Sequence, residues 1–133
     1  MTRILPLSLL ALLIALAAPA EAQTYEAYSD ARFDALQRAG ALVLVDVHAD
    51  WCPTGAQQQR VIAAYQEARP NVPLHVLRVD FDDQKDAVRR FRAPRQSTLF
   101  LFEGGERVWF AVAETRRDAI FSAIDEAAAG SSR

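Results

Sequence analysis

Cys52 is the one cysteine of this sequence, and it lies between Trp51 and Pro53, just after an apolar run that ends at Val47. Proline is favoured in the first turn of a helix, so Pro53 predicts that a helix begins directly after Cys52. The unpaired N–H groups and the dipole of a helix start favour a thiolate, the species that attacks disulfides. We therefore expect a solvent-accessible nucleophile that forms mixed disulfides. The alternative interpretation is a small buried hydrophobic residue.

The cysteine count also limits which chemistry is open to the chain. A single cysteine among 133 residues excludes an intrachain disulfide, an all-cysteine zinc site and a Cys-x-x-Cys pair. His48 and His75 with Cys52 leave copper handling as a weaker alternative, although we assign no metal ligands and no cofactor. The formal net charge of −2 argues against a nucleic-acid partner.

Hydrophobic periodicity and chain breakers predict the elements that position Cys52. Four helices are expected at residues 29–39, 53–69, 82–91 and from 115 to about 128, with Ser29 and Asp82 as caps and a Thr115/Asp118 capping box. Strands are expected at 41–47, 73–80, 98–102 and 107–113, the last two joined as a hairpin by the turn at 103–106. A strand–helix–strand unit followed by a hairpin indicates an α/β domain with one mixed central sheet.

The N-terminus has the pattern of a secretory signal. Arg3 precedes an apolar stretch over residues 7–18, and Ala20-Glu21-Ala22 provides the small residues of a cleavage site. We expect residues 1–22 to be removed after Ala22, leaving a domain over 23–133 in the periplasm or secreted, and an uncleaved membrane anchor is the alternative.

Three segments together resemble the thioredoxin family. They are Val45 to Gly55, with its Asp and its Trp-Cys at a strand–helix junction; Leu77 to Asp80, a strand that ends in Asp; and Ser97 to Glu106, a Thr-Leu strand followed by a glycine turn. The resemblance covers residues 29–128. It implies a thioredoxin-like fold with a central mixed sheet of about four to five strands flanked by helices.

The departures from the family pattern restrict the reaction. The family's second active-site cysteine falls at Gly55, the proline that faces the site in the cis form falls at Ser97, and the helix proline falls at Arg60. Because Gly55 has no thiol, a mixed disulfide at Cys52 has to be resolved by an outside thiol or by the substrate's own second cysteine. A cis peptide before a residue other than proline costs about 3–4 kcal/mol, so we expect the Gln96–Ser97 bond to be trans.

The resemblance assigns roles to the residues around Cys52. Asp46 matches the family's buried aspartate, which is associated with proton transfer; its burial should raise its pKa, and the alternative is a structural carboxyl. Trp51 is expected to shield the site or to join the core, and Thr54 to donate a hydrogen bond to the thiolate or to face solvent. Thr98 is expected to begin a strand.

The hypotheses for function follow from this site. The first is an exported, single-cysteine thiol–disulfide oxidoreductase or isomerase, with protein thiols and disulfides or a small thiol such as glutathione as partners. The second is a redox-inactive binding or chaperone-like module on the same fold. Four arginines before Ser97, at 89, 90, 92 and 95, would either face solvent or attract acidic partners to Cys52.

Overall fold

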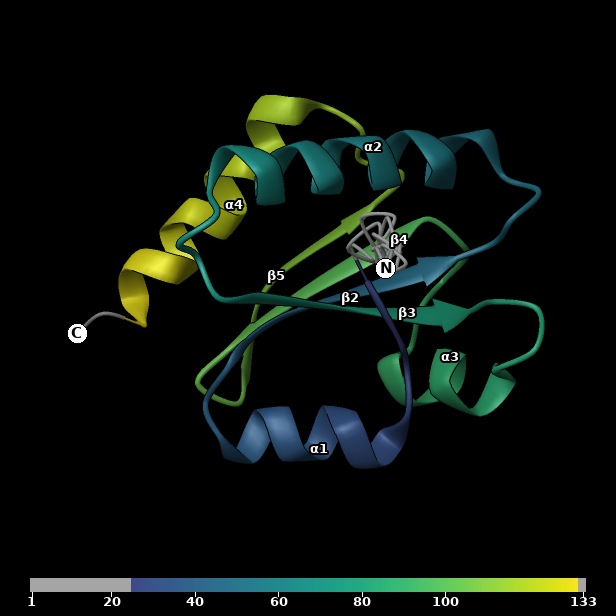
Figure 1. Ribbon diagram of the computed structural model, residues 1–133. Coiled ribbons are helices and arrows are strands. Elements are labelled where there is room, and N and C mark those ends of the chain that lie inside the picture. Colours follow the sequence, from purple (N-terminus) through teal and green to yellow (C-terminus); the bar gives the residue numbers. More distant parts are fainter. Residues whose placement is uncertain (1–24, 132–133) are drawn as a thin grey trace, which may run out of the picture.

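The strand–helix–strand unit expected around Cys52 forms the centre of the molecule (Figure 1). The computed structural model describes residues 25–131. In it β2 (Leu42–His48) leads through α2 (Pro53–Ala68) into the parallel strand β3 (Leu74–Asp80). All seven residues of β2 are buried because neighbouring strands and both layers of helices surround it. The predicted signal peptide, residues 1–22, lies outside the described residues.

A hairpin extends the sheet on the other side of β2. Strand β4 (Thr98–Glu103) pairs antiparallel with β2 and then with β5 (Glu106–Val112). The turn between them contains Gly104 and Gly105, both at positive φ, as a tight hairpin turn requires. A two-residue strand, β1 (Glu26–Ala27), pairs with β3 and was not expected from the sequence because it is too short to show a pattern. The strand order is β1-β3-β2-β4-β5, which confirms the predicted mixed α/β sheet.

The first helix, α1 (Asp30–Arg38), has the ends that the sequence predicts. The Ser29 hydroxyl accepts a hydrogen bond from the Arg32 N–H at 3.2 Å and so caps the helix. Gly40 follows the helix in the left-handed region, and its N–H donates to the carbonyl of Gln37, which ends the helix.

The caps predicted for the two later helices were wrong. Helix α3 (Lys85–Phe91) begins after Gln84, because the Asp80 carboxylate accepts the N–H groups of Asp82 and Asp83 and holds them in a turn. Helix α4 (Arg117–Gly130) begins after Arg116 with no side-chain cap. The Glu114 carboxylate instead takes the Arg116 N–H, so Thr115 and Asp118 form no capping box.

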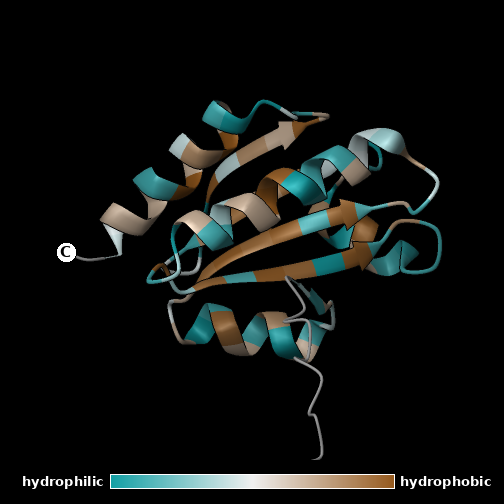
Figure 2. Cartoon of the chain, turned by 45° about the horizontal axis from the view of Figure 1, so that its top comes forward, coloured by the Kyte–Doolittle hydropathy of each residue, from teal (hydrophilic) through white to brown (hydrophobic). Residues whose placement is uncertain are grey.

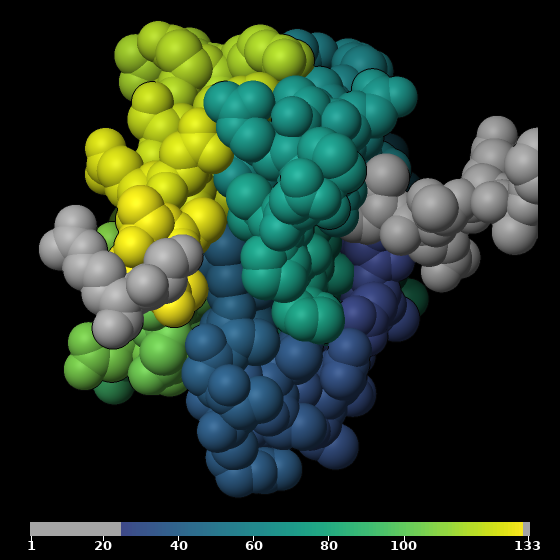
Figure 3. Space-filling model, turned by 60° about the vertical axis from the view of Figure 1, so that its left-hand side comes forward, coloured from purple at the N-terminus to yellow at the C-terminus, as the bar shows by residue number. Residues whose placement is uncertain are grey.

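The helices cover the two faces of the sheet in pairs. Figure 1 places α2 and α4 on one face and α1 and α3 on the other, and Figure 2 shows that the strands between them are mostly hydrophobic. In Figure 3 the yellow surface of α4 lies beside the teal surface of α2 and the segment after it. Tyr65 of α2 joins these helices by donating a hydrogen bond to Asp125 of α4 at 2.9 Å.

The side chains of β2 alternate between two cores because neighbouring residues of a strand point to opposite faces. Leu44 belongs to the core under α2 and α4, with Ile62, Leu99 and Ile124. Val45 belongs to the core over α1 and α3, which is rich in aromatic rings; its larger members are Tyr28, Phe33, Leu77, Phe91 and Phe100. Asp46 and His48 therefore share the face of Leu44, the face that α2 covers.

Candidate functional site

Cys52 is the residue that links the carboxyl end of β2 to α2. It is the N-cap of α2, its N–H donates to the Ala49 carbonyl at 3.0 Å, and Pro53 is the first helical residue as predicted. The sulfur therefore lies at a helix N-terminus beside the edge where β2 and β3 end, the position in α/β sheets at which ligands bind.

Hydrogen-bond donors surround the sulfur of Cys52. The Ser97 hydroxyl lies 3.4 Å from the sulfur and the Gln96 side-chain amide lies 3.8 Å away. The Ser97 hydroxyl is the main cause of a lowered thiol pKa, assisted by the backbone N–H groups of Gly55 and Thr54, and the pKa of Cys52 falls from its ordinary value of 9.0 to about 6. At neutral pH the sulfur is therefore mostly a thiolate, which is the reactive form.

The exposure of Cys52 differs from the expectation. The residue is only 6% exposed, so the predicted solvent-accessible sulfur was wrong although the predicted activation has a physical cause in the structure. Trp51 is 61% exposed, and its indole N–H donates to the Asp82 carboxylate at 2.8 Å. Trp51 therefore lies on the surface beside the cysteine and does not belong to the core, one of the two alternatives.

Ser97 completes the pocket from the loop before β4. Every peptide bond within residues 25–131 is trans, so the expected trans Gln96–Ser97 bond is confirmed. Ser97 has a φ of 60°, a left-handed conformation that is strained for a residue with a side chain. The strain is tolerated because the fold uses its backbone fully: its N–H donates to Val47, and its carbonyl accepts from Ala113 and from the Gln58 side chain. None of these backbone groups is free to pair with a substrate strand.

Thr98 and Thr54 have structural surroundings. Thr98 begins β4 as predicted, and its hydroxyl donates to the Arg95 carbonyl at 2.6 Å. Thr54 is half-buried, and it supports the thiolate through its backbone N–H, not through the side chain considered above. Gln58 is fully buried on α2 and links the Ser97 carbonyl to the Glu114 carbonyl, which holds the loop against the helix.

Asp46 lies buried on the α2 side of β2, where it pairs with an arginine. Desolvation raises the pKa of the Asp46 carboxyl, as expected, while the Arg78 guanidinium opposes the rise. Arg78 donates to the same carboxylate oxygen from two nitrogens at 3.2 and 3.3 Å. The ion pair was not expected from the sequence, and it gives Asp46 a structural partner in addition to the role in proton transfer that the resemblance implies.

His48 lies between Asp46 and Gly55. Its Nε2 is 3.3 Å from an oxygen of Asp50, and its Nδ1 is 3.9 Å from the Asp46 carboxylate. The imidazole also faces α2: a Cβ placed on Gly55 would lie 3.1 Å from Nδ1 and 3.4 Å from the Ser97 hydroxyl. His48 therefore fills the room beside position 55.

The copper alternative loses its geometry in this fold. His75 is paired with Val43 in the sheet and shares the α1 side with it, whereas His48 shares the α2 side with Leu44. The two histidines thus lie on opposite faces. Throughout the described part of the chain, no group of three or more His, Cys, Asp and Glu side chains is placed to hold a metal ion.

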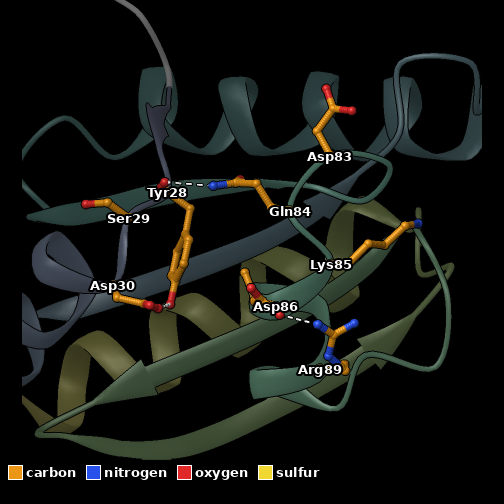
Figure 4. A pocket seen from close by; sticks show the side chains of 9 residues that line it. Tyr28, Ser29, Asp30, Asp83, Gln84, Lys85, Asp86 and Arg89 are labelled. Carbon is orange, nitrogen blue, oxygen red and sulfur yellow. Dashed lines mark hydrogen bonds and ion pairs between the residues drawn. The ribbon is translucent and has the colours of Figure 1, made fainter.

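The other face of the sheet has hollows that do not involve Cys52. Figure 4 shows one of about 410 Å³ between Tyr28 and the start of α3. Its charged groups pair with each other, Asp86 with Arg89, while Asp30 accepts from Tyr28 and from Arg90. Two of the four arginines considered as attractors of acidic partners are thus paired with acids of the chain itself.

Sequence reasoning missed three side chains of the site. Gln96 and Gln58 have no signal of their own in a single sequence, because glutamine occurs on many surfaces. His48 was considered only as a metal ligand, although its position four residues before Cys52 places it in the same strand–helix junction. Only the fold reveals that these three side chains lie beside Cys52, Ser97 or Gly55.

The comparisons with known proteins agree on one family. Residues 24–126 match the family model described as Thioredoxin. A thioredoxin of Chlamydia trachomatis is 28% identical over 88 residues, which are 66% of this chain and 84% of that protein. The crystal structure of Trxlp from Edwardsiella tarda is 40% identical with a TM-score of 0.68, covering 73% of this chain and 96% of that one.

A more distant structure shares the fold. It concerns thiol resolution in yeast mitochondrial 1-Cys peroxiredoxin via glutathione/thioredoxin systems, and it is 16% identical with a TM-score of 0.67, covering 77% of this chain and 94% of that one. Within residues 25–131 no helix is long and apolar enough to span a bilayer.

Proposed function

Because the chain belongs to the thioredoxin family, we propose that it performs thiol–disulfide exchange through Cys52 alone. The Cys52 thiolate attacks a sulfur of a partner's disulfide; a mixed disulfide forms, and the other partner sulfur leaves as a thiolate. A second thiol, from the same partner or from a small molecule such as glutathione, then attacks the mixed disulfide and releases Cys52 as a thiolate. Electrons are conserved because each step exchanges one S–S bond for another.

One observation carries this proposal: the sulfur at the start of α2 is surrounded by donors that lower the pKa of the Cys52 thiol to about 6. A low pKa supports both steps, since it makes Cys52 a thiolate at neutral pH and a good leaving group when the mixed disulfide is resolved. A merely buried cysteine would have a raised thiol pKa.

The test is the pH dependence of adduct formation with oxidised glutathione. The purified protein should form a Cys52–glutathione adduct, visible in its intact mass, with a rate that is half-maximal near pH 6. Cys52→Ser is the matched control, since it keeps a hydroxyl in place of the thiol and should give no adduct. A midpoint near the free-thiol value of about 8.5, or no adduct at any pH, would contradict the proposal.

A redox-inactive binding module is the second candidate, and two observations favour it. Cys52 is 6% exposed, and the backbone of Ser97 is already used inside the fold. The two candidates separate in the cell. Cys52→Ala should abolish the protein's function if exchange is the activity, and should leave it intact if binding alone is.

We further propose that the protein works outside the cytoplasm, in the periplasm or secreted, after removal of residues 1–22. The support is the sequence pattern of Arg3, the apolar stretch and Ala20-Glu21-Ala22. Cell fractionation with N-terminal sequencing tests this: we expect the mature chain to begin at Gln23 in the exported fraction. An intact N-terminus in the membrane fraction would instead support the anchor.

A further inference from the structure

We propose that His48 is a specificity-determining residue of this site: its imidazole occupies the room that a second thiol at position 55 would need, and so commits Cys52 to outside thiols. This inference rests on the proposed exchange function and explains how the fold enforces its single-cysteine form. His48 and Gly55 are in this sense a matched pair, since the ring is accommodated only beside a residue without a side chain.

The contact distances carry the argument. A Cβ placed on Gly55 would lie 3.1 Å from Nδ1 and 3.3 Å from Cε1 of His48, whereas ordinary contacts of a Cβ are 3.4–4 Å. A cysteine at position 55 adds a sulfur beyond that Cβ. Ser97 limits the room as well, because its hydroxyl would lie 3.4 Å from the same Cβ.

The imidazole is held in this position and has little freedom to move aside. Its side chain is 7% exposed, Nε2 lies 3.3 Å from Asp50, and Nδ1 lies 3.9 Å from the buried Asp46 carboxylate. Asp46 is itself held by Arg78. Nδ1 accepts or donates no hydrogen bond within the described structure, so its place beside Gly55 reflects packing and not a polar contact with the helix.

The consequence concerns the resolving step. In a Cys-x-x-Cys site the second thiolate attacks the sulfur of the first, forms the internal disulfide and expels the partner as a thiolate. Here that route is closed twice, by the absent thiol and by the ring in its place. Restoring the cysteine alone should therefore not restore the internal route, but restoring it together with removal of the imidazole should.

A stability cycle tests the packing without any redox reaction. Alanine favours helices over glycine, so Gly55→Ala should raise the melting temperature wherever the new methyl group fits. We expect it to raise the melting temperature in a His48→Ala background and to lower it or leave it unchanged in the wild type. Equal shifts in the two backgrounds would overturn the proposal.

Two control variants match these substitutions. Gly130→Ala changes a glycine of α4 whose Cβ would have an ordinary contact of 3.7 Å with Glu103, so its effect should be the same with or without His48. His75→Ala removes the histidine of the opposite face and should leave the effect of Gly55→Ala as it is in the wild type.

A thiol cycle tests the functional consequence. Gly55→Cys and His48→Ala/Gly55→Cys are treated with oxidised glutathione, and intact mass distinguishes the Cys52–glutathione adduct from the internal disulfide. The double variant should close to the internal disulfide and lose its adduct. Gly55→Cys alone should close at least about tenfold more slowly, the rate factor expected from the lower range of overpacking costs.

The outcomes separate this inference from the proposed function. Closure of Gly55→Cys alone as fast as the double variant overturns the role of His48. Should no protein form a glutathione adduct, the exchange function fails, while the melting temperatures of the alanine variants still test the packing. Circular dichroism confirms that each variant is folded before it is scored.

Discussion

The two faces of the central sheet serve different purposes, although the same strand, β2, supplies both. On the α1 and α3 face, Val45 and its neighbours pack against aromatic rings such as Phe33 and Phe91. On the α2 and α4 face, β2 places Asp46 and His48 near Cys52's end of the sheet, where buried polar groups gather. Apolar packing alone explains the first face, whereas the second keeps buried polar groups that have to find partners.

This difference teaches where the chain can change without loss of fold. The aromatic face stabilises the domain but contacts neither the sulfur nor its donors. The polar face sets the pKa of the Cys52 thiol through Ser97 and the start of α2. Variants of one face should therefore change stability, and variants of the other should change reactivity, with little exchange between the two effects.

The largest expected effect is on the aromatic face. Phe91 is buried, with ring centroids of Phe33 at 5.0 Å and Phe100 at 5.7 Å. Phe91→Ala should lower the free energy of unfolding by about 3–5 kcal/mol because it leaves a cavity, measured by urea denaturation. The thiol pKa of the folded variant should remain near 6. Phe110→Ala, on the exposed part of β5, is the control and should cost much less.

Next comes the pH dependence of stability that the thiol itself causes. A thiol pKa of 9.0 in the unfolded chain and about 6 in the fold means that ionisation stabilises the fold fully above pH 9. That contribution is lost as the pH falls through 6. The free energy of unfolding of the wild type, minus that of Cys52→Ser, should therefore rise between pH 6 and 9. A flat difference would contradict a lowered pKa.

A smaller effect follows from removing one of the donors. Ser97→Ala deletes the hydroxyl that contributes most to the lowered pKa of Cys52. We expect the thiol pKa to rise by about one to two units, the range of one hydrogen bond to a charged group, measured from alkylation rates against pH. Ser97→Gly also removes the hydroxyl but suits the positive φ, so it should raise the pKa equally while preserving stability better.

The smallest effect is expected at the surface. Trp51→Phe loses the indole hydrogen bond to Asp82, an exposed contact, and should change the free energy of unfolding by less than about 1 kcal/mol. The alkylation midpoint of Cys52 should stay unchanged, because Trp51 is not among the groups that shift its pKa. A large change in that midpoint would mean that the surface tryptophan, and not the polar face alone, controls the thiol.

Strong local patterns made most of the fold predictable. The apolar run of β2, Pro53 after Cys52 and the two glycines of the β4–β5 turn each specify their element within a few residues. The predictions failed where a side chain from elsewhere decides the local structure. Asp80 holds the turn before α3, so Asp82 does not cap it, and Glu114 takes the N–H of Arg116 at the start of α4.

By itself the sequence determined the fold family, the single cysteine and its place at a helix start, because these follow from local pattern and spacing. Only the tertiary structure decided what surrounds the sulfur. Ser97 lies 45 residues from Cys52 along the chain and 3.4 Å away in space. His48 meets Gly55 through the strand–helix junction, at the place of the missing thiol. The physical reason is that burial and hydrogen bonding join residues that no spacing in the sequence relates.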